Sequence, residues 1–281
     1  MKVLVAQKCG FCHGVRNAIS LAEKTLRERK DVYSLGPVIH NEQVVEKLSK
    51  KGLRIVDSVA QIPSGTVLIR SHGATREQLR KITRKHLDVV DATCVLVKRV
   101  QKIARQLRKQ GYKVVIIGDE HHPEVQAVLG STSDAVVIGK PEDLSRLPKS
   151  GKLGIVCQTT QSPDHFAQTV AAILGQGFSE LKIINTLCRE AIKRQNSAVR
   201  LCKQVDIMFV LGGLDSANTH KLAELCKKYN LQTFHLQNWS EFDKSILAGK
   251  KVAGVTAGAS TPDWVIAEFV DNLKAFDASV S

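Results

Sequence analysis

VLVAQKCGFC (3–12), DVVDATC (88–94) and KIINTLC (182–188) are three short apolar segments that each end at a cysteine. Twenty-four residues after each cysteine, a glycine closes a further apolar run: Gly36, Gly118 and Gly212. Four residues beyond each glycine stands a polar side chain: His40, His122 and Ser216. A third apolar run then ends in small polar residues, in LIRSHGAT (68–75), GIVCQTTQS (154–162) and GVTAGAST (254–261). The spacing predicts one α/β unit that the chain uses three times.

Between these landmarks the sequence alternates strand and helix patterns. Strands are expected near 2–6, 32–35, 53–56, 66–70, 87–91, 113–117, 135–138, 153–157, 181–185, 206–211, 231–235 and 251–256. Helices are expected near 14–29, 42–51, 76–85, 95–110, 123–130, 164–175, 189–203, 217–229 and 263–275. Strands separated by helices predict parallel sheets with right-handed crossovers. The expected units are 13–94, 95–187 and 188–281, and the N-terminal strand within 1–12 is expected to join the third.

Composition is that of an ordinary globular protein of 281 residues, with 43% hydrophobic and 24% charged residues. No run approaches the roughly 18 apolar residues that a membrane helix needs. The N-terminus enters a strand directly and lacks the pattern of a signal peptide, so we expect a cytoplasmic protein without a membrane partner. In that compartment the seven cysteines are expected to be reduced, which favours metal binding or catalysis over disulfides.

The chain is strongly basic, with a formal net charge of +14. The predicted helix over 95–111 carries six basic residues and no acidic one. A solvated face over a buried apolar stripe is the most common reason for such a pattern. Attraction to an acidic partner or an anionic substrate is a second interpretation. Nucleic acid is a third, but few aromatic residues and no recognised binding motif speak against it, so no nucleic-acid partner is expected.

Cys12, Cys94 and Cys188 hold the same position in the three predicted units, and we call them the three cysteines in register. Each lies where a strand ends and a helix begins. Functional groups gather at such ends in parallel α/β units, and a helix N-terminus favours a thiolate. A cysteine taken alone is more often a buried small hydrophobe, and we expect that role for Cys157, Cys202 and Cys226. Three thiolates suit either zinc with a fourth ligand or an iron–sulfur cluster that leaves one iron open. The predicted metal ligands are Cys12, Cys94 and Cys188.

Polar residues of the corresponding turns are expected to surround the cysteines. A single histidine in such a turn is usually structural, but three of them suggest donors for a multiply charged anion. The expected anion-binding residues are His40, His72, His122, Ser216, Asn218 and Ser260. A carboxylate beside a bound anion holds its proton more tightly, so Glu124 is the expected proton donor. Thr159 and Thr160 are expected to orient or relay that proton.

Many of these motifs together resemble one known family, the 4-hydroxy-3-methylbut-2-enyl diphosphate reductase (LytB/IspH) family. The matching segments are GFCHGVRNAI (10–19), GPVIHNEQVV (36–45), SHGA (71–74), DATC (91–94), HPEV (122–125), QTT (158–160), Cys188 with RQ (194–195), SAN (216–218) and TAGASTPDW (256–264). They occur in the family's order over nearly the whole chain. The resemblance implies three pseudo-symmetric α/β domains arranged as a trefoil around one 4Fe–4S cluster.

Residue by residue, the resemblance implies that Cys12, Cys94 and Cys188 bind three irons of the cluster. It implies a diphosphate site made by His40, His72, His122, Ser216, Asn218 and Ser260. It also implies that Glu124 is the proton source and that Thr159 lies beside the substrate hydroxyl. Four positions depart from the family pattern without removing any of these residues: His13, Val95, Lys193 and Ala217.

The implied reaction is the reductive removal of the hydroxyl group from an allylic diphosphate, giving isopentenyl and dimethylallyl diphosphate. The electrons come from an external donor, in this family an acidic ferredoxin or flavodoxin, which a basic surface suits. Two other classes of function stay open at the level of the residues. One is a zinc hydrolase that uses the HxE pattern at 122–124. The other is a basic nucleic-acid-binding module with structural cysteines.

Overall fold

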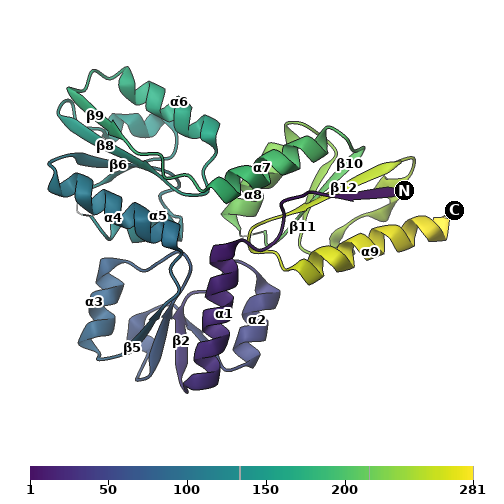
Figure 1. The fold of residues 1–281 in the computed structure, drawn as a ribbon, viewed down its shortest axis with the longest axis horizontal. Helices are drawn as coiled ribbons and strands as arrows, with labels where there is room; N and C mark the ends of the chain where they lie inside the picture. The colour runs from purple at the N-terminus through teal and green to yellow at the C-terminus, as the bar shows by residue number, and fades with distance from the viewer. Residues whose placement is uncertain (133, 215, 281) are drawn as a thin grey trace. The chain divides into compact units, whose positions relative to one another are not determined.

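The computed structural model describes residues 1–132, 134–214 and 216–280 and contains three four-stranded sheets (Figure 1). Its strands are β1 (Lys2–Val5), β2 (Val32–Leu35), β3 (Arg54–Val56), β4 (Thr66–Ile69), β5 (Asp88–Asp91), β6 (Lys113–Ile117), β7 (Val136–Ile138), β8 (Lys152–Cys157), β9 (Glu180–Ile183), β10 (Ile207–Leu211), β11 (Thr233–Leu236) and β12 (Val252–Ala257). Its α-helices are α1 (His13–Glu28), α2 (Glu42–Lys50), α3 (Arg76–Arg84), α4 (Val95–Lys109), α5 (Pro123–Leu129), α6 (Pro163–Leu174), α7 (Arg189–Cys202), α8 (Ala217–Lys227) and α9 (Asp263–Val280). The predicted alternation of strand and helix is confirmed.

The three sheets repeat one strand order. They run β3-β2-β4-β5, β7-β6-β8-β9 and β11-β10-β12-β1, and every pairing in them is parallel. The N-terminal strand β1 pairs with β12, with Lys2 opposite Val252, and so takes the edge position that β5 and β9 hold in their own sheets. These three strands, β1, β5 and β9, belong to the segments that end at Cys12, Cys94 and Cys188.

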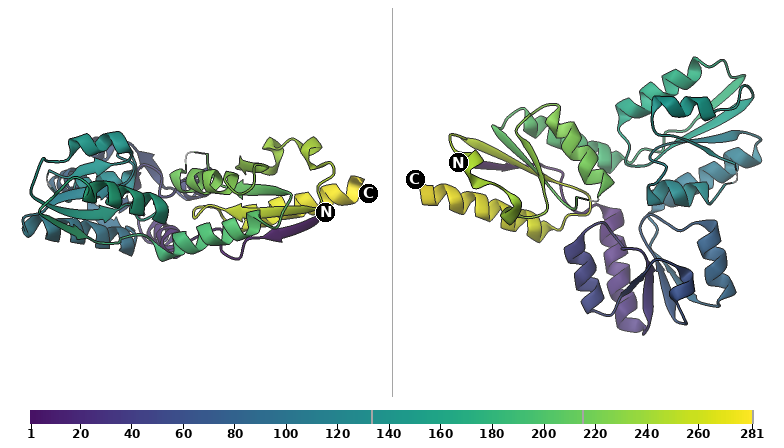
Figure 2. Two further views of the ribbon diagram at one scale, coloured as in Figure 1. Left: turned by 90° about the horizontal axis from the view of Figure 1, so that it is seen from above. Right: turned by 180° about the vertical axis from the view of Figure 1, so that it is seen from behind.

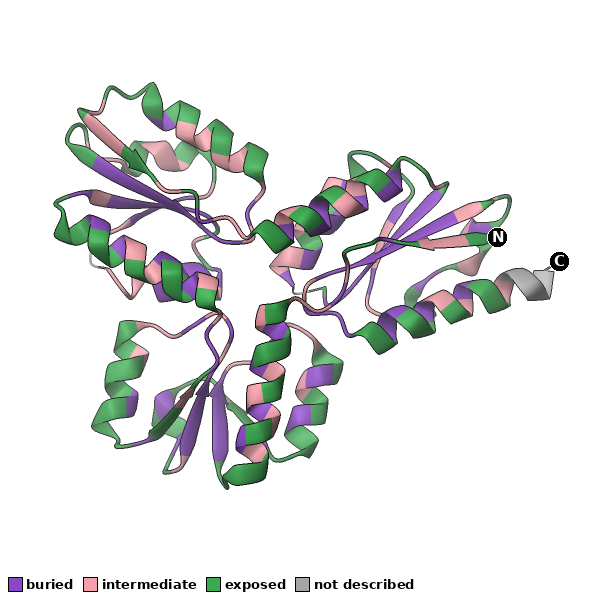
Figure 3. Cartoon of the chain, in the orientation of Figure 1, coloured by how far each residue is buried: buried purple, intermediate pink, exposed green. Residues whose placement is uncertain are grey.

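Helices cover both faces of each sheet, which explains why the strands are nearly continuous apolar runs. In the sheet around β6, alternate residues face opposite layers. Val114 and Ile116 pack with α4 and α5, whereas Val115 and Ile117 pack with Ile173 of α6. Figure 3 shows the same division, with buried central strands between helices whose outer faces are exposed.

The sheet around β10 is layered in the same way. Phe209 and Leu211 pack against Phe269 and Leu273 of α9, and Met208 and Val210 pack against α7 and α8. The two further views of Figure 2 show α9 on one side of this sheet and α7 with α8 on the other. Three parallel sheets with flanking helices, as predicted, are therefore confirmed. The trefoil around a cluster and the boundaries at 94 and 187 stay predictions.

By its internal contacts the chain divides into two compact units. Unit 1 comprises residues 1–16, 39–47 and 189–281, and unit 2 comprises residues 17–38 and 48–188. Over the described residues, no helix is both long enough and apolar enough to cross a lipid bilayer.

Candidate functional site

The three cysteines in register each stand directly before the first residue of a helix. Cys12 precedes α1, Cys94 precedes α4 and Cys188 precedes α7. The Val15 N–H donates to Cys12 Sγ at 3.4 Å, so this sulfur accepts from the first turn of α1. Cys94 occupies the N-cap of α4 without any such bond from its side chain. Sulfur at a helix N-terminus is stabilised as thiolate by unpaired N–H groups and the helix dipole.

Exposure separates these cysteines from the ones expected to be structural. Cys12, Cys94 and Cys188 are partly exposed, whereas Cys157, Cys202 and Cys226 are buried. A hydrogen bond with Cys202, together with burial, raises the pKa of the Cys226 thiol. A buried thiol with a raised pKa is a poor metal ligand, because the thiolate is the form that binds. The predicted burial of Cys157, Cys202 and Cys226 is confirmed, whereas Cys9 is partly exposed, as are the three proposed ligands.

Glu124 and Thr159 form a paired contact inside unit 2. Thr159 donates its backbone N–H to Glu124 Oε1 at 2.7 Å and its hydroxyl to Oε2 at 2.8 Å. Both residues are buried, at 2% and 5% exposure. Glu124 lies in the first turn of α5, after β6, and Thr159 follows β8, the parallel neighbour of β6. The adjacent parallel strands β6 and β8 therefore bring the two side chains together at the C-terminal end of the sheet.

Two histidines lie beside this pair. His122 caps α5, and its Nδ1 accepts the backbone N–H of Glu124 at 3.1 Å. An accepting Nδ1 carries no proton, so the neutral ring has its donor at Nε2. The His72 ring stands edge-on to the His122 ring, with centroids 5.5 Å apart. Unit 2 therefore brings together the predicted residues His72, His122, Glu124 and Thr159.

Backbone hydrogen bonds tie two of the proposed ligands in unit 2, Cys94 and Cys188, to this group. The Cys94 N–H donates to the carbonyl of Ser71, the residue before His72, at 2.9 Å. The Cys188 N–H donates to the Thr159 carbonyl at 2.8 Å. One pair of turns thus carries Cys94 and His72, another set carries Cys188, Thr159, Glu124 and His122, and the His72–His122 ring contact relates the two.

Unit 1 makes a matching set around Cys12. The Cys12 N–H donates to the Ala259 carbonyl at 3.1 Å, and the neighbouring Ser260 donates its hydroxyl to the His40 carbonyl at 3.0 Å. A Cβ at position 213 would lie 3.2 Å from that same carbonyl, a tight contact that the glycine avoids. The predicted residues Cys12, His40 and Ser260 are therefore neighbours in the fold.

The helix α8 begins beside these turns. Ser216 caps α8, and Thr219 donates both its N–H and its hydroxyl to Ser216 Oγ, at 3.4 and 3.0 Å. A Cβ at position 258 would lie 2.0 Å from Thr219 Oγ1, so Gly258 is required there. Asn218 Nδ2 is buried and has no hydrogen-bond partner among the described residues. A buried unpaired amide is costly unless a ligand accepts from it, so this atom fits an anion site.

Two features of the site differ from the sequence interpretation or were not foreseen by it. The Thr160 hydroxyl accepts from Gln158 Nε2 at 3.3 Å, and its predicted role beside Glu124 stays a prediction. Arg194 is buried on α7, and its Nη2 donates to the Gly10 carbonyl at 2.8 Å. It therefore anchors the turn that leads to Cys12. In the pattern of the sequence, the sign of this role is that Arg194 stands among the apolar residues of a predicted helix.

Neither unit, over its described residues, gathers by itself three His, Cys, Asp or Glu side chains closely enough to hold a metal ion. The HxE pattern at 122–124 is also engaged otherwise, since both Glu124 oxygens accept from Thr159 and His122 Nδ1 accepts from Glu124. This arrangement disfavours a zinc site built on that pattern.

Residues 3–274 match the family described as "LytB protein". Among curated relatives, the 4-hydroxy-3-methylbut-2-enyl diphosphate reductase of Geobacter metallireducens is 41% identical over 280 residues, which is 99% of each chain. The protein of the same name from Citrifermentans bemidjiense is 43% identical over 99% of this chain and 98% of its own.

Solved structures agree with these relatives. One is titled as the structure of (E)-4-hydroxy-3-methyl-but-2-enyl diphosphate reductase, the terminal enzyme of the non-mevalonate pathway. It is 38% identical to this chain, and it superimposes with a TM-score of 0.72 over 98% of this chain and 100% of its own. The E-1-hydroxy-2-methyl-but-2-enyl-4-diphosphate reductase of Plasmodium falciparum is 26% identical and has a TM-score of 0.92 over 97% of this chain and 88% of its own. The chain belongs to the LytB family.

Proposed function

We propose that this chain reduces 4-hydroxy-3-methylbut-2-enyl diphosphate to isopentenyl and dimethylallyl diphosphate. The substrate takes up two electrons and two protons, its C–O bond to the allylic hydroxyl breaks, and that oxygen leaves as water. The proposal is supported by the reductase names of relatives that match the whole chain. Among structural features, the buried Glu124–Thr159 pair beside two histidines supports it most directly.

Cys12, Cys94 and Cys188 fit the ligand set of a 4Fe–4S cluster. All three precede a helix N-terminus and are partly exposed, and the turns that carry them also carry the other proposed site residues. When bound, the cluster supplies single electrons and a Lewis-acidic iron to the substrate. The proposed electron donor is an acidic ferredoxin or flavodoxin. The basic helix α4, which begins directly after Cys94, is consistent with a partner of that charge.

The diphosphate is proposed to bind His40, His72, His122, Ser216, Asn218 and Ser260. His122 is held as the neutral tautomer that donates from Nε2, because Glu124 N–H occupies Nδ1. Asn218 Nδ2 supplies a buried donor without a protein partner among the described residues. Neutral donors aimed at an anion bind it without the desolvation cost of further charges.

Protons are proposed to reach the leaving hydroxyl through Glu124 and Thr159. The 2.8 Å contact between Thr159 Oγ1 and Glu124 Oε2 is short enough for direct transfer. A protonated Glu124 can pass its proton to Thr159 Oγ1 while the Thr159 hydroxyl passes its own to the substrate oxygen. The second contact, from the Thr159 N–H to Oε1, fixes the carboxyl group so that Oε2 stays on this path.

The test is turnover under strictly anaerobic conditions, with the iron–sulfur protein, a chemical reductant and the synthetic diphosphate. We expect both isoprenyl diphosphates among the products, detected by mass spectrometry, and about four irons and four sulfides per chain if one cubane cluster is present. One zinc and a colourless protein would instead favour a hydrolase. Failure to form either product with the cluster intact would refute the proposed reaction.

A further inference from the structure

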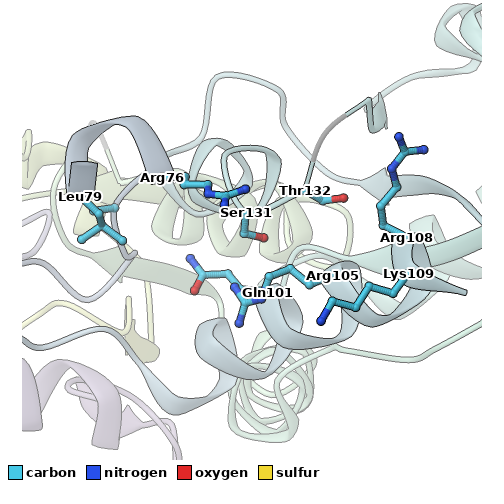
Figure 4. A pocket seen from close by; sticks show the side chains of 9 residues that line it. Arg76, Leu79, Gln101, Arg105, Arg108, Lys109, Ser131 and Thr132 are labelled. Atoms are coloured by element: carbon cyan, nitrogen blue, oxygen red, sulfur yellow. The ribbon is translucent and has the colours of Figure 1, made fainter. Parts of the chain in front are cut away.

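Unit 2 contains a basic pocket that none of the proposed site residues lines. Its volume is about 480 Å³, within the range of small-molecule sites. The pocket lies between the start of α3, the exposed face of α4 and the segment after α5, and its polar lining includes Arg76, Gln101, Arg105, Arg108, Lys109 and Thr132 (Figure 4). In Figure 4, Arg76 lies beside Ser131, whereas the side chain of Arg105 extends toward Gln101.

The positive charge of this pocket is not balanced by carboxylates. No acidic residue lines it, and none of its four cations forms a salt bridge within the part of the chain that the structure describes. Other lysines on the same helices are paired, Lys81 with Glu77 and Lys98 with Asp91. Asp134 does not line the pocket, and its pKa is lowered mainly by its hydrogen bond to Lys113 and only in small part by Arg108.

A hydroxyl donor accompanies the cations. Thr132 Oγ1 is buried and has no hydrogen-bond partner among the described residues. The adjacent Ser131 hydroxyl donates to the Val128 carbonyl at 2.7 Å. A buried hydroxyl without a partner normally indicates a missing water or ligand. Ala74 and Leu79, the latter 42% exposed, add an apolar side to the pocket.

We propose that this pocket is a second anion site, which binds a small organic phosphate. Guanidinium groups match phosphate oxygens in a bidentate geometry, and three of the four cations are arginines. Thr132 supplies a neutral donor, and Leu79 contacts the organic part of the ligand. The pocket is separate from the Glu124 site, because Ser131 lies beyond the C-terminus of α5 while Glu124 lies in its first turn, about 10 Å away along the helix axis at about 1.5 Å per residue.

The experiment is calorimetric titration of the anaerobically purified full chain with inorganic pyrophosphate at constant ionic strength. The test variant is Arg76→Ala/Arg105→Ala. The matched control is Arg80→Ala/Arg99→Ala, which removes the same charge from the same two helices at exposed positions that do not line the pocket. We expect two pyrophosphate sites in the parent chain if the proposed catalytic site also binds it. In the test variant, one site weakens at least tenfold, and in the control neither does.

Failure of the proposed function and failure of this proposal give different results. If the catalytic site binds no pyrophosphate, the parent chain shows one site and the test variant none, which still supports the pocket. Equal binding by the parent chain and the test variant would overturn it, and so would equal weakening in the control, because that indicates diffuse charge. A surface that binds poly-glutamate through Arg76 and Arg105 but not pyrophosphate would be a docking site for an acidic protein, and the phosphate proposal would be wrong.

Discussion

Thr159 donates to both carboxyl oxygens of Glu124, one through its backbone and one through its hydroxyl, at 2.7 and 2.8 Å. The two donors differ in what they can do. The backbone N–H only positions the carboxyl group, whereas the hydroxyl can pass a proton on. This difference allows the positioning role and the proton-transfer role of the pair to be tested separately.

Replacing Glu124 by Gln should abolish most turnover without loss of the cluster. Gln keeps the size of the side chain and can still accept one hydrogen bond from Thr159, but it cannot deliver a proton. General acid catalysis is typically worth about 100- to 10,000-fold, so we expect a fall of that order in kcat. Turnover is measured with a chemical reductant, so that docking of the donor protein is bypassed.

Two further variants sharpen this test. Thr159→Val removes only the hydroxyl and should also lower kcat, and the double variant should be little worse than Glu124→Gln because the two residues form one path. Glu142→Gln, at an exposed position of the same unit, should have normal activity. Near-normal turnover in Glu124→Gln would exclude Glu124 from proton transfer.

Replacement of the cysteines by Ala, one at a time, should divide them into two groups. Loss of Cys12, Cys94 or Cys188 should lower iron and sulfide content sharply, because each is a partly exposed thiol at a helix start. Loss of Cys157, Cys202 or Cys226 should leave the cluster content nearly unchanged, at a modest cost in stability from the buried cavity. Uniform iron loss across all six would contradict the register argument.

The sequence predicts those features of the site that depend on local pattern and strand order. The register of the cysteines identifies their place at strand ends, and the parallel alternation predicts that the turns after β6 and β8 are neighbours, as Glu124 and Thr159 prove to be. The tautomer of His122 could not be predicted, because it depends on a cap bond from Glu124. Nor could the contact of Arg194 with Gly10, which joins residues 184 positions apart.

His122 should have two separable roles, one at each ring nitrogen. Its Nδ1 caps α5, and its Nε2 is proposed to donate to the diphosphate. His122→Asn keeps an acceptor for the Glu124 N–H but removes the donor at Nε2, whereas His122→Ala removes both. We expect both variants to raise KM, and only His122→Ala to lose about 0.5–2 kcal/mol of folding stability through the lost cap.

Steady-state kinetics and urea unfolding measure these two effects, and iron content serves as the control. Both variants should retain full iron, because His122 is not proposed as a metal ligand. Iron loss with an unchanged KM would make the histidine a ligand and favour a zinc site. Equal stability of the two variants would show that the cap bond contributes little.

Arg194 should determine how firmly the turn before Cys12 is held. Arg194 is 6% exposed and donates from Nη2 to the Gly10 carbonyl at 2.8 Å in a buried contact, and Gly10 itself has a φ of 72°, in the left-handed region that favours glycine. Arg194→Met keeps much of the side-chain volume but removes the donor. A hydrogen bond to a charged group contributes about 1.5–3 kcal/mol, so we expect a loss of stability of that size in urea unfolding.

The same variant should release iron faster to a chelator, because Cys12 is two residues from the carbonyl that Arg194 holds. Arg200→Met is the matched control, since Arg200 lies exposed on the same helix, and it should change stability by no more than about 0.5 kcal/mol. Arg194→Lys, which keeps a cationic donor, should recover part of both losses. If Arg194→Met unfolds and releases iron like the parent chain, the turn is held by its other contacts, such as the Cys12 N–H to Ala259, and Arg194 has no positioning role.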